Sequence, residues 1–189
     1  MTDISIAIVA YNDEEDVCRA VESIEAYTSK QITKKIYIID NSTAANELSA
    51  LEQKYGDVSY LKTGQNLGFG GGHNRVLPLL DSKFHAIVNP DILLCMDAFG
   101  GLLHFMEDGK IGMSVPRIVD EQGSLLAVYR RELTVWDMFL RMFLKGAFPK
   151  RQAYHTMQDM DYDKPFEVPF AQGSFLVVRT ELFKQLGGF

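Results

Sequence analysis

The chain has 189 residues, of which 47% are apolar and 23% charged, a composition typical of a globular domain with a full hydrophobic core. Its net charge of −6 argues against a general nucleic-acid-binding surface. The two cysteines form no CxxC pair, no signal peptide is visible and no apolar run is long enough to span a bilayer, so we expect a cytoplasmic protein.

The first sixty residues alternate strand and helix patterns. Apolar runs at 4–10, 35–40 and 58–61 predict buried strands, and the second run ends in Asp40. Asn12, followed by Glu15, fits a capping box at the start of a helix. Because strands that alternate with helices form parallel βαβ units, we expect a mostly parallel sheet.

A glycine-rich segment, residues 66–74, comes next and carries four glycines in five positions. Such a segment lets the backbone approach a ligand closely or adopt positive φ angles. We predict a helix that begins near Gly72, whose free N–H groups would favour an anion. Because Pro78 follows, we expect either a kink in this helix or a short helix. The alternative is a flexible turn without a ligand.

Residues 84–91 begin as an apolar run and stop at Pro90, which places Asp91 just past the carboxyl end of a predicted buried strand. Ligands of open α/β sheets bind at that edge. A carboxylate held there by a rigid turn suits a hard cation that carries phosphate oxygens. The alternative is a turn aspartate that caps the following helix, which we predict at residues 96–108.

The remaining pattern predicts strands at 111–116, 125–129 and 175–179 and a last helix at 180–186. Between them, residues 130–151 hold six basic and two acidic side chains, a net charge of +4. Trp136, Phe139 and Phe143 would share one helical face there. One interpretation is a helix packed on the domain's own core. The other is a helix that lies in a membrane interface with its cations among anionic headgroups.

Five stretches, taken in order, resemble the family 2 glycosyltransferases of the GT-A type. Residues 8–12 and 38–42 resemble the family's first two strand-and-turn segments, and residues 66–74 resemble the NxGfaxgxN stretch of its rhamnosyltransferase-like members. Asn89-Pro90-Asp91 stands where the family has its DxD-type metal motif. Residues 173–179, with Gly187-Gly188-Phe189, resemble its acceptor-side segment.

The resemblance implies an α/β, GT-A Rossmann-like nucleotide-binding fold, with a mostly parallel central sheet flanked by helices. It implies a single domain over residues 1–189, in which 1–115 bind the nucleotide sugar and 116–189 form an incomplete acceptor-side part. It assigns Gln172 and Gly173 to the acceptor side. The residues it assigns to the nucleotide sugar are Ala10, Tyr11, Asn12, Asp40, Asn66, Gly68, Phe69, Asn74 and Asn89.

The same resemblance makes Asp91 the ligand of a Mg²⁺ or Mn²⁺ ion. The motif here carries one carboxylate, with Asn89 where a DxD motif has another, a form that rhamnosyltransferase-like members share. In the family, GGF is followed by an acidic segment that supplies the catalytic base. This chain stops at Phe189, so we expect the base beyond it and read the sequence as a fragment of a longer protein.

The implied reaction transfers a sugar, with rhamnose as a candidate, from a UDP or dTDP donor to a glycan or lipid-linked acceptor with inversion. Such an enzyme would work in cell-surface polysaccharide synthesis at the inner face of the membrane. Two alternatives stay open: a nucleotide-sugar-binding module without catalysis, and a sugar nucleotidyltransferase. The second would need a basic, glycine-rich signature near the N-terminus, where residues 10–15 are acidic instead.

Overall fold

The computed structural model describes residues 1–132, 135 and 149–189. The chain forms two compact units. Unit 1 comprises residues 1–116 and 173–189, and unit 2 comprises residues 117–172. Residues 173–189, which the resemblance groups with the acceptor-side part, thus belong with the predicted nucleotide-binding part, because their strand joins its sheet.

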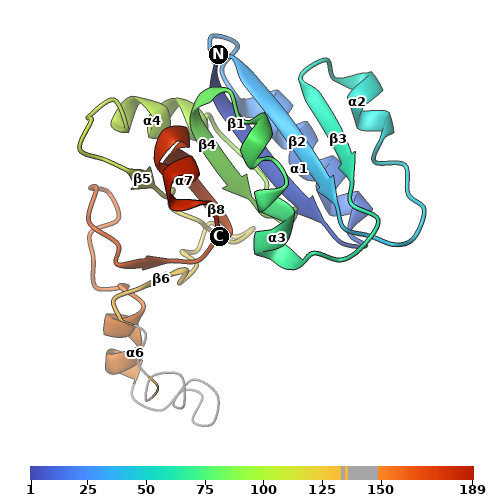
Figure 1. The fold of residues 1–189 in the computed structure, drawn as a ribbon. Coiled ribbons are helices and arrows are strands. Elements are labelled where there is room, and N and C mark those ends of the chain that lie inside the picture. Colours follow the sequence, from blue (N-terminus) through green and yellow to red (C-terminus); the bar gives the residue numbers. More distant parts are fainter. Residues whose placement is uncertain (133–134, 136–148) are drawn as a thin grey trace. The chain divides into compact units, whose positions relative to one another are not determined.

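Unit 1 is built on a six-stranded sheet of order β3-β2-β1-β4-β8-β5 (Figure 1). Four neighbouring strands run parallel, and β8 runs antiparallel to both β4 and β5. The predicted mostly parallel sheet is therefore confirmed. The strands are β1 (Thr2–Ala10), β2 (Lys34–Asp40), β3 (Val58–Lys62), β4 (Ser82–Val88), β5 (Met113–Ser114) and β8 (Phe175–Arg179).

Helices cover both faces of this sheet, with α3 and α7 on the near face in Figure 1 and α1 behind it. Helix α1 buries the apolar face that its sequence predicts, formed by Val17, Ala20, Val21 and Ile24. The helical elements of unit 1 are α1 (Glu14–Tyr27), α2 (Ala50–Lys54), α3 (Gly68–Asn74), the short 3₁₀ helix η1 (Leu77–Leu79), α4 (Ala98–Phe105) and α7 (Thr180–Leu186).

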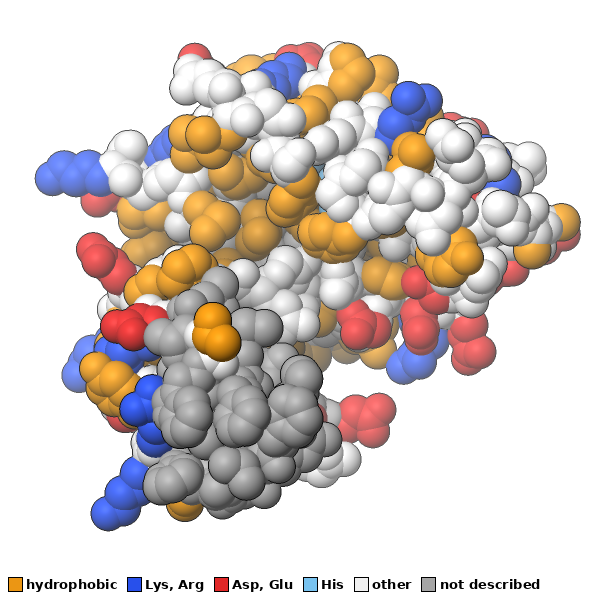
Figure 2. Space-filling view, turned by 60° about the horizontal axis from the view of Figure 1, so that its bottom comes forward, with side chains coloured by type: hydrophobic (Ala, Val, Ile, Leu, Met, Phe, Trp, Pro, Cys, Tyr) orange, Lys and Arg blue, Asp and Glu red, His pale blue; other side chains and the backbone are white. Residues whose placement is uncertain are grey.

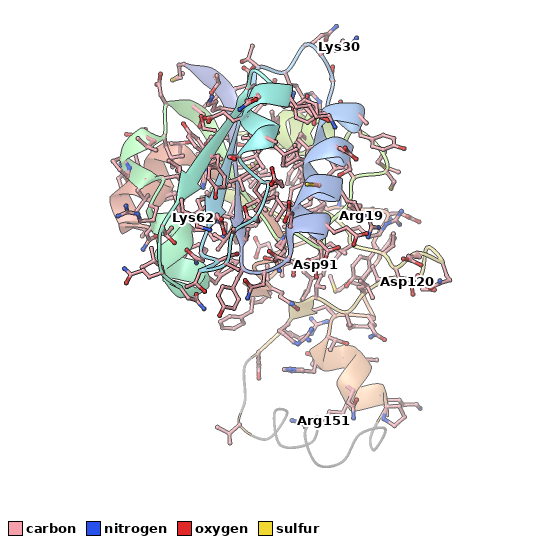
Figure 3. All side chains as sticks on the ribbon, turned by 90° about the vertical axis from the view of Figure 1, so that its right-hand side faces the viewer. Arg19, Lys30, Lys62, Asp91, Asp120 and Arg151 are labelled. Carbon is pink, nitrogen blue, oxygen red and sulfur yellow. The ribbon has the colours of Figure 1, made fainter. Side chains whose placement is uncertain are left out.

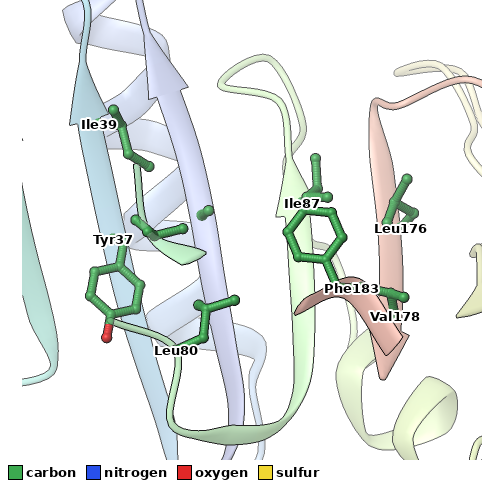
Figure 4. Close-up of a cluster of buried hydrophobic side chains, with 9 residues drawn as sticks. Tyr37, Ile39, Leu80, Ile87, Leu176, Val178 and Phe183 are labelled. Carbon is green, nitrogen blue, oxygen red and sulfur yellow. The ribbon is translucent and has the colours of Figure 1, made fainter. Parts of the chain in front are cut away.

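A hydrophobic cluster lies on the near face, where residues from the sheet meet α7 and the chain that leads into β4 (Figure 4). Phe183 of α7 is 6% exposed and packs in it. Burying a phenylalanine of this kind stabilises the fold by roughly 1.5–3 kcal/mol. The members are Ala7, Tyr37, Ile39, Val76, Leu80, Ile87, Leu176, Val178 and Phe183.

Local predictions around three helices differ from the structure in part. Asn12 does not cap α1: it takes a left-handed φ of 60°, and Asp13 precedes the helix without a side-chain cap. Helix α3 begins at Gly68, not near Gly72, and includes all four glycines. It is short, as one of the two alternatives for Pro78 predicts, and Pro78 lies in the separate 3₁₀ helix η1. Helix α4 covers only Ala98–Phe105 of the predicted 96–108.

Unit 2 is small and largely irregular, with a two-stranded sheet of β6 (Tyr129–Arg130) and β7 (Phe170–Ala171) and a helix, α6 (Pro149–His155). Arg131 makes hydrogen bonds of 2.8 and 2.9 Å to the two carboxylate oxygens of Asp159. Most of the segment 130–151, including Trp136, Phe139 and Phe143, lies outside the described residues, so its membrane interpretation stays a prediction. Within the described ranges, no helix is long and apolar enough to cross a membrane.

Candidate functional site

The predicted site residues of unit 1 gather at one edge of the sheet. Ala10 and Asp40 lie side by side in register at the ends of β1 and β2, and the Asn41 N–H donates to the Ala10 carbonyl over 2.9 Å. The antiparallel β8 starts where β4 ends, so the Asn89 N–H donates to the Ser174 carbonyl over 2.8 Å. The reversed direction of β8 thus brings Gly173, which the resemblance assigns to the acceptor, to the edge where the parallel strands end.

A pocket of about 420 Å³ opens at this edge. Asn12 forms one side, and its backbone N–H donates to the Ser42 Oγ over 2.8 Å. Figure 2 turns this edge toward the viewer and shows acidic side chains grouped toward its lower right. Tyr11, which precedes the pocket residue Asn12 in the sequence, is 50% exposed. The pocket is lined by Asn12, Glu14, Ser42, Ala44, Ala45 and Asn46.

Asp40 lies beneath this pocket and has no exposed surface. Its Oδ1 accepts a hydrogen bond from the Ser42 N–H, and its Oδ2 accepts from side chains of three other residues: Asn46, Tyr60 and Lys62. Burial alone would raise the pKa of Asp40, but the hydrogen bonds, that from Lys62 first, outweigh burial and hold this pKa well below its usual value. The carboxylate is therefore charged, and these protein groups satisfy it.

The glycine-rich helix α3 is fastened to the same edge through Asn41. The Asn41 side-chain amide donates to the Gly68 carbonyl over 3.1 Å, and its oxygen accepts from the Thr63 hydroxyl, also over 3.1 Å. A methyl group at Gly72 would lie 2.8 Å from a methyl group of Val9. Close packing on β1 therefore requires glycine at this position, and Asn66, whose Oδ1 accepts from the Gly68 N–H, shapes the turn before the helix.

Aromatic rings gather at the exposed side of α3. Phe69 is 41% exposed and packs edge-on against His73, with ring centroids 4.6 Å apart. A methyl group at Gly173 would lie 3.1 Å from the Phe69 ring, so these two predicted residues are brought together. Asn74 is bonded within the protein: its side-chain amide donates to the Phe189 carbonyl and its side-chain oxygen accepts from the Phe189 N–H, each over 3.0 Å.

Asp91 lies in the turn that follows β4, closed by a hydrogen bond from the Ile92 N–H to the Asn89 carbonyl (Figure 3). Its side chain is exposed, as a metal ligand shared with a substrate must be. The described residues bring no three His, Cys, Asp or Glu side chains together. A single exposed carboxylate fits a Mg²⁺- or Mn²⁺-type ion that takes its other ligands from phosphates and water.

Four residues of this edge are not among the predicted site residues: Asn41 and Ser42, which belong to the matched segment 38–42, and Asn46 and Lys62. The first three follow Asp40 in a polar turn, which is itself a signal at the end of a buried strand. The pairing of Lys62 with Asp40 is not predicted by the sequence pattern, because it depends on the register of β3, in which Lys62 lies opposite Asp40. Gln172 belongs to unit 2, where its N–H donates to the Val128 carbonyl.

The sequence was compared with known families and proteins. The model of "Glycosyl transferase family 2" matches residues 5–187. The chain belongs to this family. The match favours the glycosyltransferase interpretation over a sugar nucleotidyltransferase.

Two curated relatives span this chain almost completely. A "Low-salt glycan biosynthesis hexosyltransferase Agl10" of Haloferax volcanii is 24% identical over 99% of the chain and 56% of its own length. An "N-acetylglucosaminyl-diphospho-decaprenol L-rhamnosyltransferase" of Mycobacterium tuberculosis is 27% identical over 100% of the chain and 66% of its own length. The chain therefore spans between about half and two thirds of the length of these relatives.

Solved structures share the fold at low sequence identity. A mannosyltransferase from Pyrobaculum calidifontis, in complex with GDP-Man and Mn²⁺, matches with a TM-score of 0.69 and 14% identity, over 100% of this chain and 49% of that one. TarS of S. aureus, in complex with UDP, matches with a TM-score of 0.64 and 14% identity, over 97% of this chain and 48% of that one. These likenesses confirm the predicted GT-A fold.

Proposed function

We propose that this chain carries the nucleotide-sugar-binding part of a glycosyltransferase, which moves a sugar from a nucleoside-diphosphate donor to a glycan or lipid-linked acceptor. The observation that carries the proposal is a convergence at one sheet edge. There the chain places a polar pocket of about 420 Å³, the Asp91 turn and the Gly173 segment at the ends of neighbouring strands. That edge is where open α/β sheets bind ligands.

Each part of the edge suits one part of a nucleotide sugar. The pocket offers amide and hydroxyl groups from Asn12, Ser42 and Asn46, which can hydrogen-bond a nucleoside, and the exposed Tyr11 ring can stack on a base. Asp91 would hold a Mg²⁺ or Mn²⁺ ion, which when bound neutralises charge on the diphosphate. Phe69 and Gly173 would face the sugar and the acceptor, and the base that takes the acceptor proton is expected beyond Phe189.

The relatives support glycosyl transfer as the class of reaction and indicate which acceptors and nucleotides to test. One is named for transfer to a diphospho-decaprenol-linked sugar, and the other for glycan synthesis. The structural neighbours bind GDP-Man with Mn²⁺ and UDP. We infer a lipid-linked or glycan acceptor, with UDP and dTDP as the first nucleotides to test and rhamnose as the first sugar.

The proposal is tested by titrating UDP, dTDP and GDP, and then their sugars, into the chain with and without Mn²⁺. We expect Mn²⁺ to strengthen the binding of one diphosphate, and Asp91→Asn to weaken binding in Mn²⁺ by about tenfold or more while leaving metal-free binding unchanged. Asp81→Asn is the matched control, because Asp81 is an exposed aspartate just before β4, at the opposite edge of the sheet. Equal metal dependence in wild type and Asp91→Asn would refute the metal assignment, and no nucleotide binding would refute the function.

A further inference from the structure

An ion pair between a partly exposed lysine and a buried aspartate lies next to the pocket residues. The Lys62 ammonium lies 2.6 Å from the Asp40 Oδ2, and the side chain of Asp40 is 0% exposed while that of Lys62 is 37% exposed. The carboxylate accepts four hydrogen bonds from within the protein and presents no surface to a ligand. A direct contact between Asp40 and a nucleoside, which the resemblance predicts, would require these bonds to rearrange.

The groups that hold Asp40 are those that shape the pocket. Ser42 and Asn46 donate to its two oxygens, and both line the pocket. Lys62 also donates to the carbonyl of Ala44, a third lining residue, over 3.2 Å. Through the Ser42 hydroxyl, which accepts from the Asn12 N–H, the network reaches Asn12, a fourth lining residue. Four of the six lining residues are therefore tied to one carboxylate and its counter-charge.

The charge of Lys62 is what makes this arrangement stable. A carboxylate removed from water is costly unless an opposite charge and hydrogen bonds compensate it. Tyr60 and Asn46 are neutral donors, so Lys62 is the one cation among the side chains that bond Asp40 in the described structure. Without that charge the carboxylate would gain by drawing water or by leaving its site, and either movement would displace the residues that it bonds.

We propose that Lys62 is a positioning residue for the nucleoside pocket. It acts through Asp40 to fix the wall formed by residues 42–46. The inference rests on the proposed function, because it assigns the pocket to the nucleoside part of the donor. Lys62 would thus govern affinity for the nucleoside, whereas Asp91 governs the metal-dependent affinity for the diphosphate.

The decisive variants are Lys62→Met, which removes the charge and keeps the apolar stem, and Lys62→Arg, which keeps a cation. Lys34→Met is the matched control: Lys34 also bonds two carboxylates, Glu25 at 2.9 Å and Asp57 at 2.7 Å, but it begins β2 at the opposite edge of the sheet. We expect Lys62→Met to weaken the binding of nucleoside monophosphates and of nucleoside diphosphates by the same factor, about tenfold. Lys62→Arg should retain much of the wild-type affinity, and Lys34→Met should bind both kinds of nucleotide as the wild type does.

A second readout needs no ligand. The Ser42 amide donates to Asp40, so its hydrogen exchange reports whether the wall is held. We expect Lys62→Met, but not Lys34→Met, to accelerate this exchange by about tenfold relative to wild type. If Lys62→Met does not fold, Lys62→Gln is measured in its place, because it keeps a donor without the charge.

The outcomes separate the two proposals. Faster Ser42 exchange with no nucleotide binding by the wild type would support the positioning role and refute the proposed function. Wild-type exchange in Lys62→Met would overturn the positioning role whether or not nucleotides bind. Equal losses in Lys62→Met and Lys34→Met would overturn it too, since they would report a general loss of stability.

Discussion

The side chain of Asn74 and the backbone of Phe189 are joined by two hydrogen bonds, each 3.0 Å long, across 115 positions of sequence. The Asn74 amide donates to the Phe189 carbonyl, and the Phe189 N–H donates to the Asn74 oxygen. The bonds fasten the end of α7 to the end of α3, and the Phe189 ring packs edge-on against Phe69 at 5.3 Å. Asn74, predicted to contact the nucleotide sugar, is committed here to a contact within the protein.

Asn74→Ala should therefore release the C-terminal residues. Two partly exposed hydrogen bonds of this kind contribute about 1–2 kcal/mol, so we expect a loss of that size in the free energy of unfolding. Amide exchange at Phe189 should rise by about tenfold, because its acceptor is gone. Asn66→Ala is the control, since Asn66 lies in the same segment but its side chain accepts from the Gly68 N–H and not from Phe189. Unchanged exchange at Phe189 in Asn74→Ala would show that ring packing alone holds this end of the chain.

Two buried histidines predict how stability depends on pH. His73 and His85 are both 0% exposed, and among the described residues neither ring nitrogen of His73 has a hydrogen-bond partner. Burial lowers the pKa of His73 to about 4 and that of His85 to about 3. Both are therefore neutral in the folded protein at pH values where the unfolded chain, with pKa values near 6.5, binds protons.

Stability should accordingly fall as the pH drops from about 7 toward 4. In that window each of these histidines contributes a slope of up to about 1.4 kcal/mol per pH unit, because the unfolded state binds a proton that the folded state does not. His73→Leu removes one of them, so the difference in unfolding free energy between this variant and wild type should move in the variant's favour as the pH falls. Urea unfolding at pH 7, 6 and 5 measures it, with His104→Leu as the same change at an exposed position. A difference that stays constant with pH would contradict the buried neutral state of His73.

The sequence predicts three strands of unit 1 well because their apolar runs are buried on both faces of the sheet, whereas only Met113–Ser114 of the predicted strand 111–116 forms a strand. Residues 4–10, 35–40 and 84–88 carry this signal and become β1, β2 and β4. Their ends then place Ala10, Asp40 and Asn89 at one edge, so the location of the site follows from the parallel order of the strands.

The details within the site depend on tertiary contacts that a linear pattern does not contain. Lys62 reaches Asp40 because β3 pairs with β2 in a register that sets the two residues opposite each other. Asn12 looks like a helix cap, but its N–H bonds Ser42, thirty positions away, and the turn takes a left-handed conformation. The helix at Gly68–Asn74 forms against the low helix propensity of its glycines, because packing on Val9 and Asn41 outweighs propensity.

The close packing of α3 on Val9 and Asn41 gives a specific prediction for Gly72. A β-carbon there would lie 2.8 and 2.9 Å from the two methyl groups of Val9 and 3.2 Å from the Asn41 amide nitrogen, so Gly72→Ala must push α3 away from β1. We expect it to lower the free energy of unfolding by about 1–3 kcal/mol, even though alanine favours helices. Gly101→Ala in α4 makes the same substitution with no atom within 4 Å, and should stabilise the protein by about 0.4–1 kcal/mol. Chemical denaturation of the two variants separates the effect of packing from that of helix propensity. If both substitutions stabilise the protein, α3 does not pack against Val9 as closely as the structure shows. The anchoring of the glycine-rich segment to the site edge would then come from Asn41 alone.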